Sequence, residues 1–391
     1  MNVYMDHAGT TPLDPRVAKE MEPYSLTKYG NPSSLYTMGM EAREGIDEAR
    51  SQISKFLNVK NTYDKIVFTS GGTESNNLAL KGVAYAYRKK GKHIITSKIE
   101  HHAILEPCEW LEKEGFQVTY LPVDKYGMVN PQELESAIRK DTILVSIMHA
   151  NNEIGTIEPI EELTKVAHDH GVLFHTDAVQ TYGKIPVDVE AMQVDILSMS
   201  AHKIYGPRGV GALYIRKGVR MQPLLHGGGH EFRKRSGTEN TPGIVGFGMA
   251  TKIAKSEMSH DKKKQSKLRD KLIKGSLLID NSRLNGHPKK RLPNNVNCIY
   301  LYVEGESLIL ELDFHGISAN TGSACSSKSL EPSHVLGALG LKPEESHGSI
   351  RFTLGRQNTK EEVNYVLEVL PKVIERFRSI SPFKEDFILQ E

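Results

Sequence analysis

The chain has 391 residues, of which 38% are hydrophobic and 25% are charged, as in an average globular protein with a sizeable core. This length exceeds that of one ordinary domain and predicts a large domain with a smaller companion. Its 50 basic and 48 acidic side chains give a formal net charge of +2, and this balance argues against nucleic acid as a partner.

The cysteine content and the N-terminus indicate a reducing compartment. The chain has three cysteines, Cys108, Cys298 and Cys325, with no Cys-x-x-Cys pair, which excludes a disulfide framework. The first residues contain no apolar signal core, and no later apolar run is long enough to span a bilayer. We therefore expect a cytoplasmic protein that has no membrane segment.

Strand-like and helix-like patterns alternate through the first half of the chain. Apolar runs typical of buried strands are followed by amphipathic stretches typical of helices. This alternation predicts an α/β protein with a mostly parallel sheet and helices on both of its faces. The expected strands lie at 65–70, 93–97, 143–149, 172–174 and 194–199, and the expected helices at 41–56, 78–88 and 103–113.

A glycine turn that contains Gly72 and Thr73 follows the first of these strands and leads to the helix at 78–88. The N-terminus of a helix offers free backbone N–H groups and the positive end of the helix dipole, so this turn predicts an anion site. The pattern is neither a Walker loop nor a Gly-x-Gly-x-x-Gly motif, and it does not indicate a nucleotide. An ordinary capped turn is the alternative for this stretch taken alone.

Polar side chains gather where the predicted strands end. The carboxyl ends of parallel strands meet at one edge of a sheet, and the loops there build the binding site. We therefore expect the following side chains to lie close together: His101, Asn152, Asp177, Gln180, Ser200, His202 and Lys203.

Lys203 follows the predicted strand at 194–199, which is an unusual place for a residue that normally stays at the surface. A lysine amine can attack a carbonyl and hold it as a Schiff base. Ser200 and His202 are suited to binding a phosphate group beside it. Pyridoxal phosphate is the cofactor that needs a lysine amine and a phosphate cradle together. A solvated loop lysine is the alternative for Lys203 taken alone.

The histidine pairs do not predict a metal site. His226 and His230 are separated by three glycines, which suit a flexible turn and not a helical pair of ligands. His101 and His102 are adjacent and point to different faces of whatever element carries them. We therefore expect no bound metal.

The pattern changes beyond Ser256, where a charge run at 259–264 begins a surface helix. We place a domain boundary here, between a large domain of residues 14–258 and a small α+β domain. The small domain comprises residues 1–13 and 259–391. Its expected strands lie at 296–303 and 349–354, and its expected helices at 307–314, 333–339 and 360–378.

Small polar residues dominate the stretch 320–332, which predicts an exposed, mobile loop. Cys325 lies in this loop, although unpaired cysteines are usually buried. We therefore expect Cys325 to have a reactive thiol and not a packing role. Cys298 and Cys108 lie in a predicted strand and a predicted helix, and we expect both to be inert.

With Lys203 and Cys325 together, the chain resembles the pyridoxal-phosphate-dependent cysteine desulfurases of the NifS/IscS type, in the class-V aminotransferase family. The resemblance extends from Asp6 to about Arg378 and implies the aminotransferase-like fold of pyridoxal-phosphate-dependent transferases. It rests on the motifs Thr-Ser-Gly-Gly-Thr-Glu-Ser-Asn-Asn (69–77), Glu-His-His (100–102), Asn-Asn-Glu-Ile-Gly (151–155), Ala-His-Lys-Ile-Tyr-Gly-Pro (201–207), Arg-Ser-Gly-Thr (235–238) and Gly-Ser-Ala-Cys (322–325).

The resemblance implies a role for each residue around the cofactor. Lys203 would carry pyridoxal phosphate, and His101 would stack on its ring and help to move protons. Asp177 would pair with the ring nitrogen, and Gln180 would contact the phenolic oxygen. The remaining implied cofactor-binding residues are Asn152 and the phosphate-binding set Gly72, Thr73, Ser200 and His202, joined by Thr238 from the other subunit of a homodimer.

The resemblance also implies that the substrate is L-cysteine and the product L-alanine. Asn152 and Arg351 would hold the substrate carboxylate, and Cys325 would take the sulfur as a persulfide. The implied partner is a sulfur-acceptor protein such as an iron–sulfur scaffold, for iron–sulfur cluster assembly, tRNA thiolation or both. The tail at 382–391 does not match the segment with which family members dock a scaffold.

Two other readings of the sequence compete with this one. A selenocysteine lyase of the same fold would use Lys203 in the same way but would not need Cys325. A non-catalytic scaffold for partner proteins would retain the fold alone. The intact lysine, aspartate and phosphate cradle argue against the scaffold.

Overall fold

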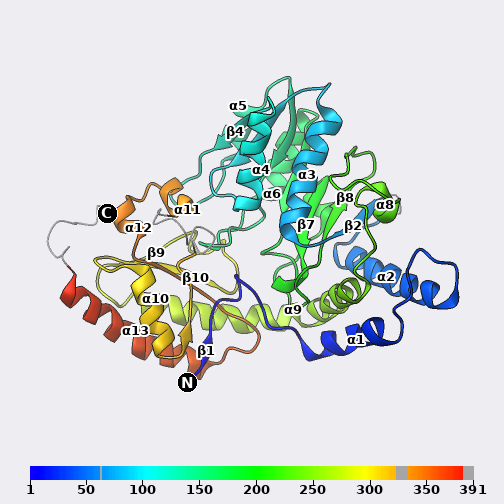
Figure 1. Ribbon diagram of the computed structural model, residues 1–391. Coiled ribbons are helices and arrows are strands. Elements are labelled where there is room, and N and C mark those ends of the chain that lie inside the picture. The colour runs from blue at the N-terminus through cyan, green and yellow to red at the C-terminus, as the bar shows by residue number, and fades with distance from the viewer. Residues whose placement is uncertain (62–63, 323–332, 382–391) are drawn as a thin grey trace.

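The computed structural model describes residues 1–61, 64–322 and 333–381 and contains a seven-stranded sheet beside a smaller antiparallel one (Figure 1). Strand β8 of the large sheet is antiparallel to both of its neighbours, and all other neighbouring pairs are parallel, which confirms the predicted mostly parallel sheet. Its strands in spatial order are β2 (Lys65–Thr69), β8 (Gly211–Ile215), β7 (Ile196–Ser200), β6 (Leu173–Asp177), β5 (Thr142–Ser146), β3 (His93–Ser97) and β4 (Gln117–Leu121).

Helices cover both faces of the large sheet, as predicted. Successive side chains of a strand point to opposite faces. Ile66 and Phe68 therefore join one core cluster with α2 and α9, and Val67 joins another with α3 and α4. The helices of this part are α1 (Pro15–Leu26), α2 (Thr37–Phe56), α3 (Gly72–Tyr87), α4 (His102–Lys113), α5 (Pro131–Ala137), α6 (Ile160–Asp169), α7 (Val189–Met192), the 3-10 turn η1 (Ala201–Lys203), α8 (His230–Arg233) and the long α9 (Thr241–Ser276).

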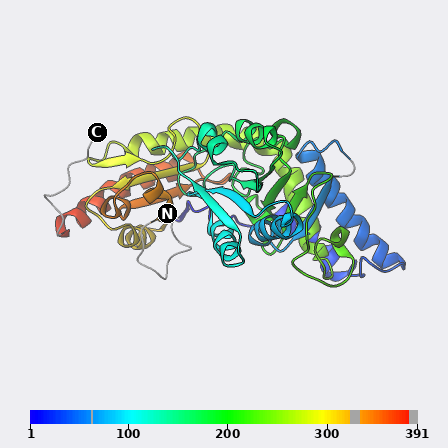
Figure 2. The same ribbon diagram turned by 90° about the horizontal axis from the view of Figure 1, so that it is seen from above.

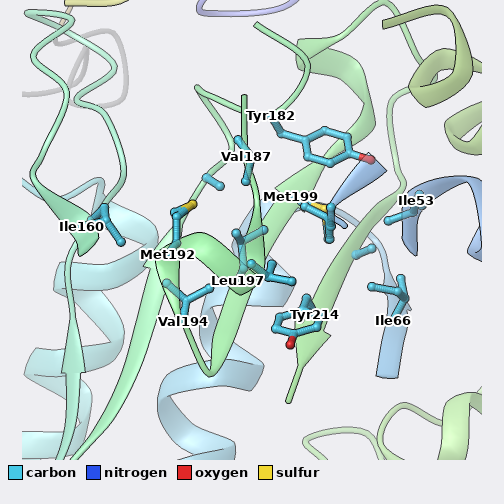
Figure 3. Close-up of a cluster of buried hydrophobic side chains, with 14 of the residues drawn as sticks. Ile53, Ile66, Ile160, Tyr182, Val187, Met192, Val194, Leu197, Met199 and Tyr214 are labelled. Carbon is cyan, nitrogen blue, oxygen red and sulfur yellow. The ribbon is translucent and has the colours of Figure 1, made fainter. Parts of the chain in front are cut away.

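The core cluster in Figure 3 fixes the strand that leads to the predicted cofactor lysine. Leu197 and Met199 of β7 are fully buried beside Tyr214 of β8 and Tyr182. Burying one such apolar side chain contributes about 1.5–3 kcal/mol to folding. The hydroxyl of Tyr182 shares a hydrogen bond of 3.0 Å with Thr251, so this polar group is not left unpaired. This packing holds the carboxyl end of β7, and with it η1, in one position.

A second core forms around the small antiparallel sheet of β12 (Ser349–Thr353), β10 (Asn295–Tyr300) and β9 (Ser282–Leu284). Strand β1 (Val3–Tyr4) pairs with β11 (Ile317–Ser318), so the first residues of the chain lie in this part of the molecule. The helices here are α10 (Gly305–Phe314), α11 (His334–Ala338), α12 (Pro343–Ser346) and α13 (Lys360–Ile380).

Helix α9 is a single helix of 36 residues that runs along both parts of the molecule (Figures 1 and 2). The predicted boundary between residues 258 and 259 falls inside it, and the division into domains stays a prediction. The predicted loop around Cys325 lies outside the described residues. No helix among residues 1–61, 64–322 and 333–381 is both long enough and apolar enough to cross a membrane.

Candidate active site

A cavity of about 360 Å³ opens at the carboxyl ends of the parallel strands, where the sequence predicts the site. Its wall is completed by the loop after β1 and by β12 of the small sheet. The structure brings most of the predicted site residues to this wall: Gly72, Thr73, His101, Asn152, Asp177, Gln180, Ser200, His202, Lys203 and Arg351.

Two of the predicted residues are not part of this wall as the structure describes it. Thr238 is exposed and does not line the cavity of its own chain. Its expected role is to bind the cofactor phosphate in the site of the other subunit of a homodimer. Cys325 lies outside the described residues. The two cysteines predicted to be inert, Cys108 and Cys298, are fully buried.

Helix α3 begins at Gly72, six residues before the start at Leu78 that the sequence predicts. The N-terminus of α3 therefore lies at the cavity. The first N–H groups of a helix have no partner inside it and attract an anion. The hydroxyl of Ser200 is buried in the same wall and has no hydrogen-bond partner among the residues that the structure describes. A β-carbon at position 72 would lie only 2.8 Å from Cγ2 of Val179, which explains a glycine there.

Lys203 lies in η1, directly after β7. Its Nζ donates hydrogen bonds of 2.6 Å to the carbonyl oxygens of Ala8 and Gly9 in the loop after β1. These contacts hold the amine at the cavity wall beside Ser200 and His202. A lysine amine held in a partly buried cavity is the group that a carbonyl cofactor requires.

Asp177 ends β6 and points its carboxylate into a set of donors. Oδ2 accepts a hydrogen bond of 2.6 Å from Nδ2 of Asn76, and Oδ1 accepts one of 2.9 Å from the backbone N–H of Val179. A carboxylate fixed in this way is suited to pairing with a protonated ring nitrogen. Asn76 lies on α3, and its buried Oδ1 has no hydrogen-bond partner within residues 1–61, 64–322 and 333–381.

His101 caps α4, with Nδ1 accepting a hydrogen bond of 3.0 Å from the backbone N–H of Ala103. Burial lowers the pKa of His101, an effect that the carboxylate of Asp177 opposes and the charge of Lys203 reinforces. The neutral ring therefore carries its proton on Nε2. Burial, with the charge of Lys203, also lowers the pKa of His202 to about 4.

Arg351 of β12 brings a buried guanidinium to the cavity wall, with a side chain only 5% exposed. Nη2 is 2.7 Å from Oδ1 of Asp6, and Nη1 donates a hydrogen bond of 3.0 Å to the carbonyl oxygen of Asn152. Nε is buried and has no hydrogen-bond partner in the described part of the chain. The guanidinium therefore retains capacity for a carboxylate ligand.

Three polar side chains of the cavity wall are absent from the sequence-based prediction: Asp6, Asn76 and Asn320. Asn76 belongs to the motif at 69–77, and Asp6 is the first residue of the region of resemblance. Both could therefore be predicted as site residues from the sequence. Asn320 pairs through its backbone with Arg351, and this contact depends on the tertiary fold.

These residues fit pyridoxal phosphate. The α3 N-terminus with the buried hydroxyl of Ser200 suits the phosphate, Asp177 suits the ring nitrogen, and Lys203 supplies the amine. The volume of about 360 Å³ lies within the usual range for small-molecule and cofactor sites.

Comparisons with known proteins agree with this arrangement. Residues 3–366 match the family model of class-V aminotransferases. The cysteine desulfurase IscS of Dictyoglomus turgidum is 58% identical over 98% of both chains, and that of Methanosarcina thermophila is 56% identical over 97% of this chain and 94% of its own. A solved NifS-like protein, 42% identical, superposes with a TM-score of 0.90 over 96% of this chain and all of its own. The chain therefore belongs to the class-V aminotransferases and, within them, to the IscS-type cysteine desulfurases.

Proposed function

We propose that this protein is a pyridoxal-phosphate-dependent cysteine desulfurase that converts L-cysteine to L-alanine and receives the sulfur on Cys325. The observation that carries the proposal is the convergence of Lys203, Asp177 and the N-terminus of α3 on one cavity. The names of the relatives, cysteine desulfurase IscS, support the substrate.

Bound pyridoxal phosphate supplies an electron sink that makes the bonds at the substrate's α-carbon labile. Asp177 would keep a proton on the ring nitrogen, because its carboxylate is held in place by Asn76 and the backbone of Val179. The N–H groups of Gly72 and Thr73, with Ser200 and His202, would hold the phosphate. Gln180 would contact the phenolic oxygen.

The substrate is held through its carboxylate. Arg351 offers a charged donor at the cavity wall, and Asn152, whose carbonyl orients that guanidinium, lies beside it. A charged hydrogen bond of this kind contributes about 1.5–3 kcal/mol. The ring of His101, neutral near pH 7, provides an N–H group in the same cavity.

The sulfur step balances without a further reactant. The carbon–sulfur bond of L-cysteine breaks, a sulfur–sulfur bond forms on Cys325, and the substrate β-carbon gains a proton to give L-alanine. Cys325 follows Gly322, which lines the cavity, by three residues, a span of at most about 11 Å of extended chain. A sulfur-acceptor protein, such as an iron–sulfur scaffold or a tRNA-thiolation protein, would then take up the persulfide sulfur.

The first test is to fix the cofactor on the protein chemically. The purified protein should be yellow, and borohydride reduction followed by peptide mapping should place the cofactor on Lys203 alone. Recovery of the label on another lysine would contradict the proposal. A colourless protein that takes up no pyridoxal phosphate would favour a non-catalytic scaffold.

We also propose that the working unit is a cytoplasmic homodimer in which Thr238 completes the phosphate site of the partner. Its exposed position, away from the cavity of its own chain, supports this role. Mixing Lys203→Ala subunits with Thr238→Ala subunits should give heterodimers with one intact site and restored activity. If Thr238→Ala impaired only the site of its own chain, the shared site would be wrong.

We keep the proposed division into a large domain of residues 14–258 and a small domain of residues 1–13 and 259–391. The two separate core clusters, one around each sheet, support it. The small domain would carry the loop with Cys325.

A further inference from the structure

Lys184 is a partly buried lysine to which the mechanism above gives no role. It follows Gln180 by four residues in the turn after β6, and its Nζ donates a hydrogen bond of 3.0 Å to Oε1 of Gln180. Gln180 lines the active-site cavity, and Lys184 does not. Lys184 instead lines a separate cavity of about 20 Å³, large enough for one water molecule, which also touches Lys203.

The hydrogen bonds of Gln180 define which end of its amide is the oxygen. The amine of Lys184 is a donor, so the amide atom that it contacts is the oxygen. The carbonyl oxygen of Ala8 is only an acceptor, and it lies 3.1 Å from the amide nitrogen. The two contacts agree, and they leave the second N–H of Gln180 for a ligand in the cavity.

The same carbonyl of Ala8 also accepts a hydrogen bond of 2.6 Å from Nζ of Lys203. Gln180 and Lys203, the two side chains expected nearest the phenolic oxygen and the cofactor linkage, thus share one acceptor. A rotation of the Gln180 amide would bring its oxygen against the oxygen of Ala8. Lys184 opposes this rotation from the other end of the amide.

We propose that Lys184 is a positioning residue that holds the Gln180 amide with its nitrogen toward the cavity, so that Gln180 donates a hydrogen bond to the phenolic oxygen of the cofactor. This inference rests on the proposed cofactor site and assigns it a further residue. Gln180 touches the cofactor, and Lys184 acts through it.

The electrostatic setting of Lys184 supports a specific role for it. No carboxylate forms an ion pair with Lys184 among residues 1–61, 64–322 and 333–381. Burial, reinforced by the charges of Lys203 and Arg351, lowers the pKa of Lys184 to about 7. The charge is therefore unfavourable at this position. The amine still donates to Gln180 in either protonation state, because –NH₃⁺ and –NH₂ both carry N–H groups.

The test is a double-mutant cycle read by cofactor binding and not by turnover. Cofactor-free wild type, Lys184→Met, Gln180→Ala and the double variant are titrated with pyridoxal phosphate, and the visible absorption gives Kd and the band position. Lys184→Met should weaken binding by about five- to tenfold, the ratio expected for one hydrogen bond, and shift the absorption band. In the Gln180→Ala background, Lys184→Met should change Kd by less than about twofold, because the amide through which Lys184 acts has been removed.

Two control variants accompany the cycle. Lys184→Arg keeps a donor and should bind within about threefold of wild type. Lys90→Met removes a lysine whose Nζ donates to the carbonyl of Gly171 on the surface, and it should leave Kd and the absorption band unchanged.

Equal weakening by Lys184→Met in both backgrounds would overturn the proposal, as would an unchanged Kd in the single variant. If Lys184→Met does not fold, Gln180→Glu takes its place, since a carboxylate accepts from Lys184 but offers the cofactor no N–H. Unchanged binding by Gln180→Glu would then overturn the proposal. Failure of the wild type to bind pyridoxal phosphate would instead contradict the proposed function.

Discussion

Asp6 and Arg351 form an ion pair of 2.7 Å at the wall of the cavity, on the guanidinium that is expected to bind the substrate carboxylate. Asp6 comes from the loop after β1, and Arg351 comes from β12 in the small sheet. The protein's own carboxylate thus already contacts the arginine. A substrate carboxylate would be the second anion on one cation, and Asp6 weakens the attraction that it experiences.

The first prediction follows from this pair. Asp6→Asn keeps the size of the side chain and its ability to accept a hydrogen bond but removes the negative charge. We expect KM for L-cysteine to fall several-fold while kcat does not rise, because Arg351 then faces one carboxylate and not two. Steady-state kinetics of the loaded enzyme measures this.

A matched control is Asp169→Asn, which removes a surface carboxylate of α6 that pairs with the exposed Lys165. It should leave KM unchanged. A rise in KM for Asp6→Asn would contradict the prediction and show that Asp6 is needed to orient the guanidinium.

The second prediction concerns Asp177 and the asparagine that holds it. A carboxylate at the ring nitrogen gains a charged hydrogen bond of about 1.5–3 kcal/mol, so Asp177→Ala should bind pyridoxal phosphate at least about tenfold more weakly and lose turnover. Asn76→Ala removes only the 2.6 Å contact to Oδ2 and should act in the same direction with a smaller effect. Cofactor titration and alanine production measure both. Normal turnover by Asp177→Ala would show that the cofactor lies in a different orientation.

Sequence patterns predict the parallel sheet, and the sheet explains why the seven side chains expected at its strand ends line one cavity. Residues at the carboxyl ends of parallel strands meet at one edge, whatever their separation along the chain. The start of α3 was predicted six residues late because its first turn is polar, and the apolar periodicity appears only from Leu78. The polar turn is the part that faces the cavity.

Asp6 could not be predicted from the pattern of its own segment. Its position depends on the parallel pairing of β1 with β11 and on the bridge between Asp6 and Thr353, contacts across more than 300 residues of chain. The role of Lys184 has the same origin, because Gln180 and Ala8 meet only in the folded protein. Periodicity reports which face of an element is buried, and it does not report which loop lies against it.

The third prediction is a pH dependence of stability from Glu100, a fully buried glutamate after β3. Burial raises its pKa to about 8, although Ser97 and the N–H of Met148 donate hydrogen bonds to Oε1. The folded protein therefore keeps the proton on Glu100 between pH 4.5 and pH 8, while the unfolded chain releases it. Because the folded state binds more protons in this range, Glu100 makes stability fall as the pH rises from about 4.5 to about 8.

Glu100→Gln removes this titration. At pH 7 the cofactor-free variant should be more stable than the wild type by about 1–3 kcal/mol, and near pH 4.5 the two should converge. Urea unfolding at both pH values measures the difference. Glu109→Gln, a change at an exposed position of α4, should alter stability at neither pH. A lower stability of Glu100→Gln at pH 7 would contradict a protonated Glu100.

The last prediction separates the sulfur step from cofactor binding by comparing the three cysteines. The attacking species is a thiolate, and burial raises the pKa of Cys298 to about 12 and raises that of Cys108 as well, so neither thiol ionises near neutral pH. Cys298→Ser and Cys108→Ser should therefore keep their activity, apart from a loss of stability through the polar hydroxyl in a core.

Cys325→Ser should behave in the opposite way. It should stay yellow and change its absorption spectrum when L-cysteine is added, because Lys203, Asp177 and Arg351 are intact. It should form no persulfide, however, and it should release alanine more slowly than the wild type. Mass spectrometry of the protein after incubation with L-cysteine detects the added sulfur atom, and an amino-acid assay detects the alanine. If Cys325→Ser produced alanine at the wild-type rate, sulfur would leave the substrate without a protein thiol, and the lyase reaction would describe this enzyme better than persulfide transfer.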